Sequence, residues 1–168
     1  FDMYTWKSVC KTLAAWQDKG CKLVPFSINV SMIDITNLDV PQYLSMLTEQ
    51  YHISPAYLPV EITESVFAES NTIVKNTITR FHKKGFYVLM DDFGSGYSSL
   101  NVLKDANVDY LKLDMKFMQI DAKNKGKGIQ ILKSIVDMAY RLGLVISAEG
   151  VETKEQSEIL KSMNCNYG

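Results

Sequence analysis

The chain has 168 residues, of which 46% are hydrophobic and 22% charged, with a formal net charge of −1. This composition excludes a disordered chain and a disulfide-dependent mini-protein, and it is typical of one soluble domain over residues 1–168. The lysines and arginines are scattered, so we expect no surface for duplex nucleic acid. No apolar run reaches the roughly 20 residues that cross a bilayer. The odd number of cysteines indicates reduced thiols and a cytoplasmic location.

The chain opens on a pattern of helical spacing. Apolar residues recur at Trp6, Val9, Cys10, Leu13 and Trp16. This spacing predicts a helix that Gly20 ends as its C-cap. The helix is already under way at Phe1, so we expect a further segment upstream in the parent protein.

Short apolar runs then alternate with helical stretches. The runs that we interpret as strands are Leu23–Val30, Leu58–Ile62, Phe86–Met90, Tyr110–Leu113 and Leu144–Ala148. Pro41 marks the first turn of one intervening helix, and Gly85 and Gly143 mark the ends of two others. Thr153 with Gln156 predicts a capping box for the last helix. We expect residues 121–128 to form a short basic loop.

The alternation predicts a parallel α/β fold. Periodicity alone leaves two architectures open, an open doubly wound sheet and a closed (β/α) barrel. A barrel needs eight strands and roughly 250 residues. Five strands in a chain of this length would therefore be an incomplete barrel.

Polar side chains recur at the carboxyl end of each predicted strand. They are Asn29, then Glu61 with Glu64, Asp91 with Asp92, Lys112 with Asp114, and Glu149 with Glu152. In a parallel barrel these strand ends converge on one rim, where active sites are built. So many carboxylates need cations nearby, and oxygen donors favour Mg²⁺ or Mn²⁺ over zinc. Adjacent aspartates are also typical of two-metal hydrolysis of phosphate esters.

Each of these residues has an ordinary structural explanation when taken alone. Asn29 suits a turn, Asp91 and Asp92 suit a helix cap, and Glu152 suits the dipole of the helix that follows it. Lys112 either stabilises charge on a phosphate and its attacking water or only neutralises the rim. Their joint occurrence at strand ends favours a functional site.

Five sequence blocks together resemble the EAL domain family in order and spacing. The blocks are Asn-Val-Ser at 29–31, Glu-Ile-Thr-Glu-Ser at 61–65, Asp-Asp-Phe-Gly-Ser-Gly-Tyr-Ser-Ser at 91–99, Lys-Leu-Asp at 112–114 and Ala-Glu-Gly-Val-Glu-Thr at 148–153. They span nearly the whole chain. A block of nine residues with four others at family spacing is far more specific than any two-residue motif.

The resemblance implies a (β/α)8 barrel of the EAL type that hydrolyses cyclic di-GMP to linear pGpG with Mg²⁺ or Mn²⁺, in a pair of ions. The implied metal ligands are Asn29, Glu61, Asp91 and Asp92. The implied pair that positions the attacking water is Lys112 and Glu149. Glu152 resembles a residue near the substrate guanine, and Asp114 resembles a contact to the substrate or to the residues around it. Glu64 resembles the glutamate that braces the loop after Asp92, which the family uses in coupling between dimer partners.

Two departures from the family pattern concern the ends of the chain. The glutamate of the Glu-Ala-Leu signature, a metal ligand on the first strand, would lie upstream of Phe1. The chain stops at Gly168, where the family continues with a Gln-Gly-Tyr stretch. We therefore expect this chain to be a partial EAL domain that binds metal weakly and hydrolyses little by itself. Ser95 replaces the more usual threonine without an expected effect.

Three functions remain at this point: an active phosphodiesterase, an inactive cyclic di-GMP receptor, and another metal-dependent barrel enzyme. The specificity of the motifs argues against the third. The intact polar set favours catalysis over the receptor, because receptors of this family tend to lose such residues. The expected partners are cyclic di-GMP, a second copy of the barrel in a homodimer, and attached sensory or diguanylate cyclase domains. The parent protein is expected in the cytoplasm or anchored at its membrane.

Overall fold

The computed structural model describes residues 2–69, 72–94, 100–114 and 125–165. The chain divides into two compact units, which we describe separately. The first comprises Phe1–Ile62 and Val66–Leu89, and the second comprises Thr63–Ser65 and Met90–Gly168. The strands follow the order β1-β2-β3-β4-β5, and both β2 and β3 contribute residues to each unit.

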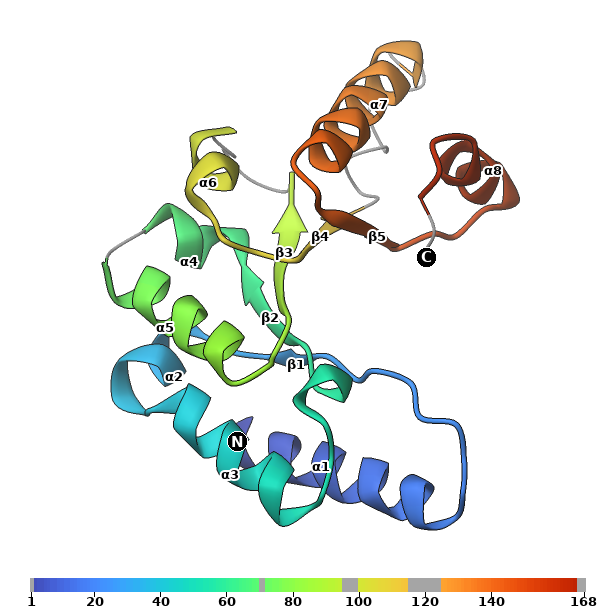
Figure 1. Ribbon diagram of the computed structural model, residues 1–168. Coiled ribbons are helices and arrows are strands. Elements are labelled where there is room, and N and C mark those ends of the chain that lie inside the picture. Colours follow the sequence, from blue (N-terminus) through green and yellow to red (C-terminus); the bar gives the residue numbers. More distant parts are fainter. Residues whose placement is uncertain (1, 70–71, 95–99, 115–124, 166–168) are drawn as a thin grey trace. The chain divides into compact units, whose positions relative to one another are not determined.

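The elements alternate between helix and strand, as predicted (Figure 1). Up to β3 they are α1 (Asp2–Asp18), β1 (Ile28–Asn29), α2 (Met32–Asn37), α3 (Val40–Gln50), the short 3-10 helix η1 (Pro55–Tyr57), β2 (Val60–Thr63), α4 (Glu64–Ala68), α5 (Thr72–Lys83) and β3 (Val88–Phe93). After β3 they are α6 (Leu100–Asp105), β4 (Tyr110–Asp114), α7 (Lys125–Arg141), β5 (Val145–Glu149) and α8 (Lys154–Ser162).

Helix α1 ends where the sequence predicts. Gly20 has φ +68°, and its N–H donates to the carbonyl of Gln17 at 2.9 Å. The N–H of Cys21 donates to the carbonyl of Trp16 at 3.0 Å. A residue in the left-handed region with these two bonds closes the last turn, and glycine adopts that region without strain. The predicted C-cap is confirmed.

Strand β1 is much shorter than the predicted run Leu23–Val30. The N–H groups of Phe26 and Ile28 donate to the carbonyls of Tyr57 and Pro59, each at 2.9 Å. The register pairs Ile28 with Val60, so the next ladder bond would run from residue 59 to the carbonyl of Phe26. Pro59 has no N–H and leaves that bond unmade. The same proline explains why β2 begins at Val60 and not at the predicted Leu58.

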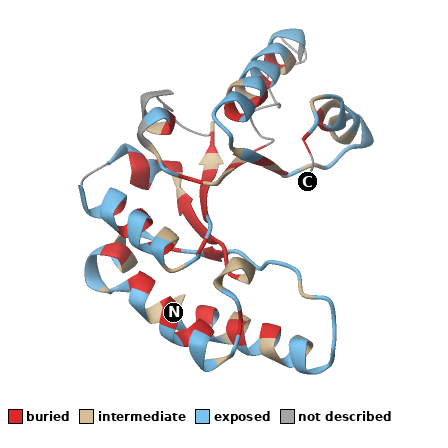
Figure 2. Cartoon of the chain, viewed as in Figure 1, coloured by how far each residue is buried: buried red, intermediate tan, exposed pale blue. Residues whose placement is uncertain are grey.

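The core of the first unit lies between its helices and strands. Helix α3 contacts both α1 and α5, and α5 also contacts α2. Figure 2 shows the buried residues of this unit along β2 and along one side of each helix. The rings of Phe81 and Phe86 lie 5.9 Å apart at 74°, an edge-to-face pair on either side of the turn at Gly85. That turn has φ +83° at Gly85, which confirms the predicted end of α5.

The second unit is built on the parallel pair β4 and β5. The register matches Tyr110 with Val145 and Asp114 with Glu149, and α7 packs against β5. The prediction of a loop over residues 121–128 is wrong for its second half, because α7 begins at Lys125. Leu132, with Val136 and Ala139 after it, is almost fully buried, so packing of this stripe extends the helix despite two glycines in its first turn. Residues 121–124 lie outside the described residues.

Helix α8 has the predicted capping box. The Thr153 side chain accepts from the N–H of Gln156 at 3.2 Å, and Gln156 Oε1 accepts from the N–H of Thr153 at 2.9 Å. Before α8, Gly143 has φ +76° at the end of α7, as predicted. Pro41 is the second residue of α3, after the N-cap Asp39. In the described part of the chain, every helix is too short or too polar to cross a membrane.

Candidate active site

Strand β3 carries two adjacent carboxylates at its end. The sequence predicted a strand that ends at Met90, with both aspartates after it. The strand instead runs to Phe93, so Asp91 and Asp92 lie inside it. Consecutive side chains of a regular strand point to opposite faces. Asp92, however, has φ +56°, in the left-handed region that aspartate tolerates better than most residues, and its N–H donates to Asp91 Oδ1 at 2.9 Å. This local turn allows both carboxylates to reach one place.

A third carboxylate joins them from β5. Oxygen atoms of Asp91, Asp92 and Glu149 all lie within 4.8 Å of one another. Asp91 is buried, with 8% of its surface exposed, whereas Asp92 and Glu149 are half-buried. The group consists of carboxylates that come from two strand ends, as the sequence pattern predicted.

The ammonium of Lys112 bridges two members of this group. Its Nζ lies 3.1 Å from Asp91 Oδ1 and 2.9 Å from Glu149 Oε2. The side chains of Lys112 and Asp91 are only 19% and 11% exposed, whereas that of Glu149 is 39% exposed. The contact to Asp91 is therefore the better shielded from solvent. Glu149 keeps an accessible face.

Asp114 adds a fourth acidic side chain to this part of the sheet. It is directly opposite Glu149 in the β4–β5 register, so the two side chains lie on the same face, and it is 5% exposed. Burial raises the pKa of Asp92, and the charges of Asp91, Glu149 and Asp114 raise it further, while Lys112 acts in the opposite direction. Among the described residues, four carboxyl groups beside one ammonium leave an excess of negative charge.

This excess fits a bound divalent cation. The donors are carboxylate oxygens, which are the ligands of Mg²⁺ and Mn²⁺, and thiolates and imidazoles are absent from the group of three that could share an ion. Burial is the main cause of the raised pKa of Asp92, and repulsion from the neighbouring carboxylates, which Lys112 only partly offsets, adds to it. A divalent ion would offset this repulsion.

Glu64 contacts the turn that follows β3. It is the first residue of α4 and is 7% exposed, and its Oε2 accepts a hydrogen bond from the backbone N–H of Gly94 at 3.2 Å. Gly94 has φ +94°, a conformation that favours glycine. The expected contact of Glu64 with the segment after Asp92 is thus present at Gly94. Residues 95–99, which include Ser95, lie outside the described residues.

Asn29 and Glu61 form a pair in the first unit. They are directly opposite each other in the parallel register of β1 and β2, so their side chains share one face of the strands. Glu61 is 7% exposed and Asn29 is exposed. The register places these two residues opposite each other, and their roles as oxygen donors stay a prediction. The structure also shows a contact that the sequence did not predict, from Nε1 of Trp6 to the backbone carbonyl of Asn29 at 3.0 Å.

Glu152 lies between β5 and α8 with its side chain exposed. Its backbone N–H donates to Gln156 Oε1 at 2.8 Å, which makes it part of the cap of α8. This bond uses the backbone of Glu152, and the role considered for its carboxylate toward the dipole of α8 stays a prediction. A role toward substrate rests on the exposed carboxylate alone.

Comparison with known proteins identifies relatives over the whole chain. The EAL domain family model matches residues 1–168. A probable cyclic di-GMP phosphodiesterase, PdeB of Escherichia coli (strain K12), is 36% identical over 143 residues, which are 84% of this chain and 26% of that protein. The chain spans about a fifth to a quarter of the length of the curated relatives that it matches first.

Solved structures give the same result for the fold. A PaMucR phosphodiesterase in complex with c-di-GMP superposes with a TM-score of 0.87 and 27% identity, covering 98% of this chain and 66% of the other. The EAL domain of Mycobacterium smegmatis DcpA superposes with a TM-score of 0.86 and 29% identity, covering 98% and 73%. Of the two architectures that periodicity left open, these likenesses select the EAL-type barrel.

Proposed function

The chain belongs to the EAL domain family, and from this premise we propose that it carries the site at which cyclic di-GMP is hydrolysed to linear pGpG. The observation that carries the proposal is the Lys112 ammonium between Asp91 and Glu149, with Asp92 in the same cluster. The activity named for PdeB and the ligand named for the PaMucR structure support the choice of substrate.

The metal requirement follows from the charge of the site. Bound Mg²⁺ or Mn²⁺, in a pair of ions, would act as a Lewis acid on the phosphate and lower the pKa of the attacking water. Asp91 and Asp92 are the proposed ligands from the second unit, since their oxygens lie within 4.8 Å of each other. Asn29 and Glu61, which are opposite each other in the β1–β2 register, are proposed as further ligands on the basis of the family resemblance.

Lys112 and Glu149 are the proposed catalytic pair. Glu149 has an exposed carboxylate face that can accept a hydrogen bond from the attacking water and orient it toward phosphorus. Lys112 holds that carboxylate in place through its 2.9 Å contact and offers a positive charge to the developing negative charge of the phosphate. Asp114 is buried, which favours support of this pair over direct contact with substrate. Glu152, being exposed, is the proposed contact to the nucleotide.

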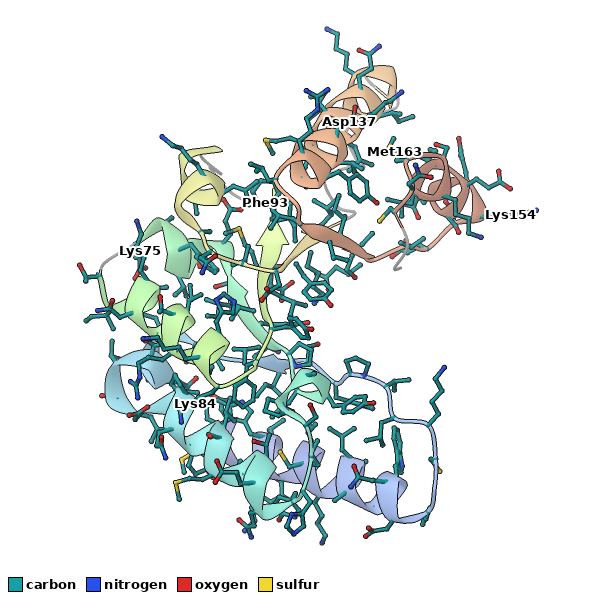
Figure 3. The ribbon with its side chains drawn as sticks, in the orientation of Figure 1. Lys75, Lys84, Phe93, Asp137, Lys154 and Met163 are labelled. Carbon is teal, nitrogen blue, oxygen red and sulfur yellow. The ribbon has the colours of Figure 1, made fainter. Side chains whose placement is uncertain are left out.

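Turnover separates this function from that of a receptor that binds cyclic di-GMP without cleaving it. The protein that contains this chain is incubated with cyclic di-GMP and Mn²⁺, and the nucleotides are separated by chromatography. We expect linear pGpG with Mn²⁺ and none in chelator, and loss of product in Asp91→Asn. Asp137→Asn is the control, since Asp137 is an exposed aspartate on α7 (Figure 3). Tight binding of cyclic di-GMP with no product in Mn²⁺ would identify a receptor.

The remaining partners are proposals of the same kind. A homodimer through the barrel rests on the family resemblance of the segment braced by Glu64. Sensory or diguanylate cyclase domains in the same protein are supported by the greater length of the relatives. A cytoplasmic location rests on the odd number of cysteines in the sequence, which indicates reduced thiols.

A further inference from the structure

An indole N–H donates to a backbone carbonyl on the side of β1 that faces away from β2. Alternate residues from Phe26 to Val30 donate their backbone N–H groups to carbonyls of residues 57–61, each at 2.9 Å. Since alternate residues of a strand direct their backbone groups to opposite edges, the carbonyl of Asn29 faces away from β2. This carbonyl accepts the hydrogen bond from Nε1 of Trp6 at 3.0 Å. The indole therefore occupies the position of a ladder partner at the last residue of the strand.

Trp6 is itself held in place by two helices. It belongs to α1, is 1% exposed, and its ring centroid lies 6.0 Å from that of Tyr43 on α3. A buried indole N–H needs an acceptor, and the carbonyl of Asn29 provides one across 23 residues of sequence. The contact thus ties the end of β1 to the packed pair of helices α1 and α3.

The hydrogen bond from Trp6 is made to the backbone of Asn29, whose side chain is a proposed metal ligand. Ile28 and Val30 are 2% and 3% exposed, so their side chains face the core, and the intervening Asn29 presents its amide on the other face beside Glu61. The strand has only two residues, and the cap of α2 begins at Ser31. The bonds of Ile28 and Val30 hold the side of the backbone that faces β2, and the bond from Trp6 holds the carbonyl of Asn29 on the opposite side.

We propose that Trp6 is a positioning residue for divalent-metal binding. Its Nε1–H fixes the backbone of Asn29 and keeps the amide oxygen of Asn29 next to the carboxylate of Glu61, as two adjacent oxygen donors. The inference rests on the proposed function, which makes these two residues ligands. Groups that orient metal ligands typically contribute about 10- to 100-fold to metal affinity. Trp6 acts through the backbone, so we expect a loss of about tenfold, at the low end of that range.

The test measures Mn²⁺ affinity by calorimetry, without substrate, in the protein that contains this chain. Trp6→Phe removes the N–H, and replacement of Trp6 by benzothienyl-alanine removes it while keeping the size of the ring system. Trp16→Phe is the matched control, since Trp16 lies on the same helix and packs on Phe26 with centroids 5.4 Å apart. Asn29→Ala reports the contribution of the ligand itself.

We expect both Trp6 variants to bind Mn²⁺ about tenfold more weakly while Trp16→Phe binds as the wild type does. In the Asn29→Ala background, Trp6→Phe should have no further effect. If Asn29→Ala loses affinity but both Trp6 variants keep it, the inference is wrong and the proposed function stands. If Trp16→Phe weakens binding as much as Trp6→Phe, the effect is one of general packing and the positioning role is refuted. A wild-type protein that binds no Mn²⁺ would refute the proposed function, and the inference with it.

Discussion

Substitution of Lys112 by methionine separates charge balance from metal ligation. The change keeps the length of the side chain and removes the cation that lies 3.1 Å from Asp91 and 2.9 Å from Glu149. Breaking a fully buried ion pair costs about 3–5 kcal/mol, and an exposed one up to about 1 kcal/mol. The Asp91 contact is mostly buried and the Glu149 contact is screened by solvent, so we expect the free energy of unfolding in chelator to fall by about 2 kcal/mol.

Manganese should reverse most of this loss. The bound cation replaces the neutralising charge of Lys112, so the stability difference should shrink below about 1 kcal/mol in Mn²⁺. Mn²⁺ affinity should therefore rise by at least about fivefold, because a competing positive charge is gone and a stability difference that shrinks by about 1 kcal/mol requires tighter binding of that size. Hydrolysis should nevertheless fall by about 10²- to 10³-fold, as when one charge-stabilising group is removed from an active site.

Urea denaturation, calorimetry and turnover measure these three quantities on the same protein. Lys154→Met is the matched control, since Lys154 at the start of α8 pairs with Glu158 at 3.8 Å with both side chains exposed (Figure 3). That change should alter stability by no more than about 0.5 kcal/mol and leave turnover unchanged. A Lys112→Met protein that loses Mn²⁺ binding, or that keeps full turnover, would refute the assigned role.

Three further predictions follow from the same geometry. In chelator, Asp92→Asn should raise the free energy of unfolding at neutral pH, because the folded state raises the pKa of Asp92 and so binds its proton more tightly than the unfolded state does. This gain in the free energy of unfolding should shrink as pH falls through the raised pKa toward the ordinary pKa of aspartate. Urea denaturation measures it, and a gain that grows as pH falls would contradict the account. Glu64→Ala should speed hydrogen exchange at the Gly94 amide and lower turnover by about tenfold, as for other supporting contacts, whereas Glu64→Gln, which keeps an acceptor, should do so less. Thr153→Ala should lower stability by about 1 kcal/mol through loss of the α8 cap, with Mn²⁺ affinity unaffected.

Much of the site was predictable because strand ends carry a simple signal. Apolar runs are followed by Asp91, Lys112 and Glu149, and this pattern predicted that the three side chains would lie close together. The structure confirms their proximity within the second unit. The caps at Gly20 and Thr153 were equally accessible, because each depends on residues within one turn of the helix end.

Other features depend on interactions that no local pattern encodes. The left-handed φ of Asp92 arises from its place at the end of β3, and periodicity gave no sign of it. The early start of α7 depends on burial of its apolar stripe, which includes Leu132, and on packing of the helix against β5. The bond from Trp6 to Asn29 joins residues 23 positions apart, and spacing identified Trp6 only as part of a helical stripe. Pro59 was visible in the sequence, but its effect on β1 required the register.

Hydrolysis in water enriched in ¹⁸O tests the central claim most directly. The protein that contains this chain is mixed in excess with cyclic di-GMP and Mn²⁺ for a single turnover, and the product is analysed by mass spectrometry. If Asp91, Asp92 and Glu149 hold metal and orient water for attack on phosphorus, the linear product carries one ¹⁸O on its terminal phosphate, and neither chelator-treated protein nor Glu149→Gln forms it at a comparable rate. Full turnover in chelator, or a product without the label in its phosphate, would contradict the account.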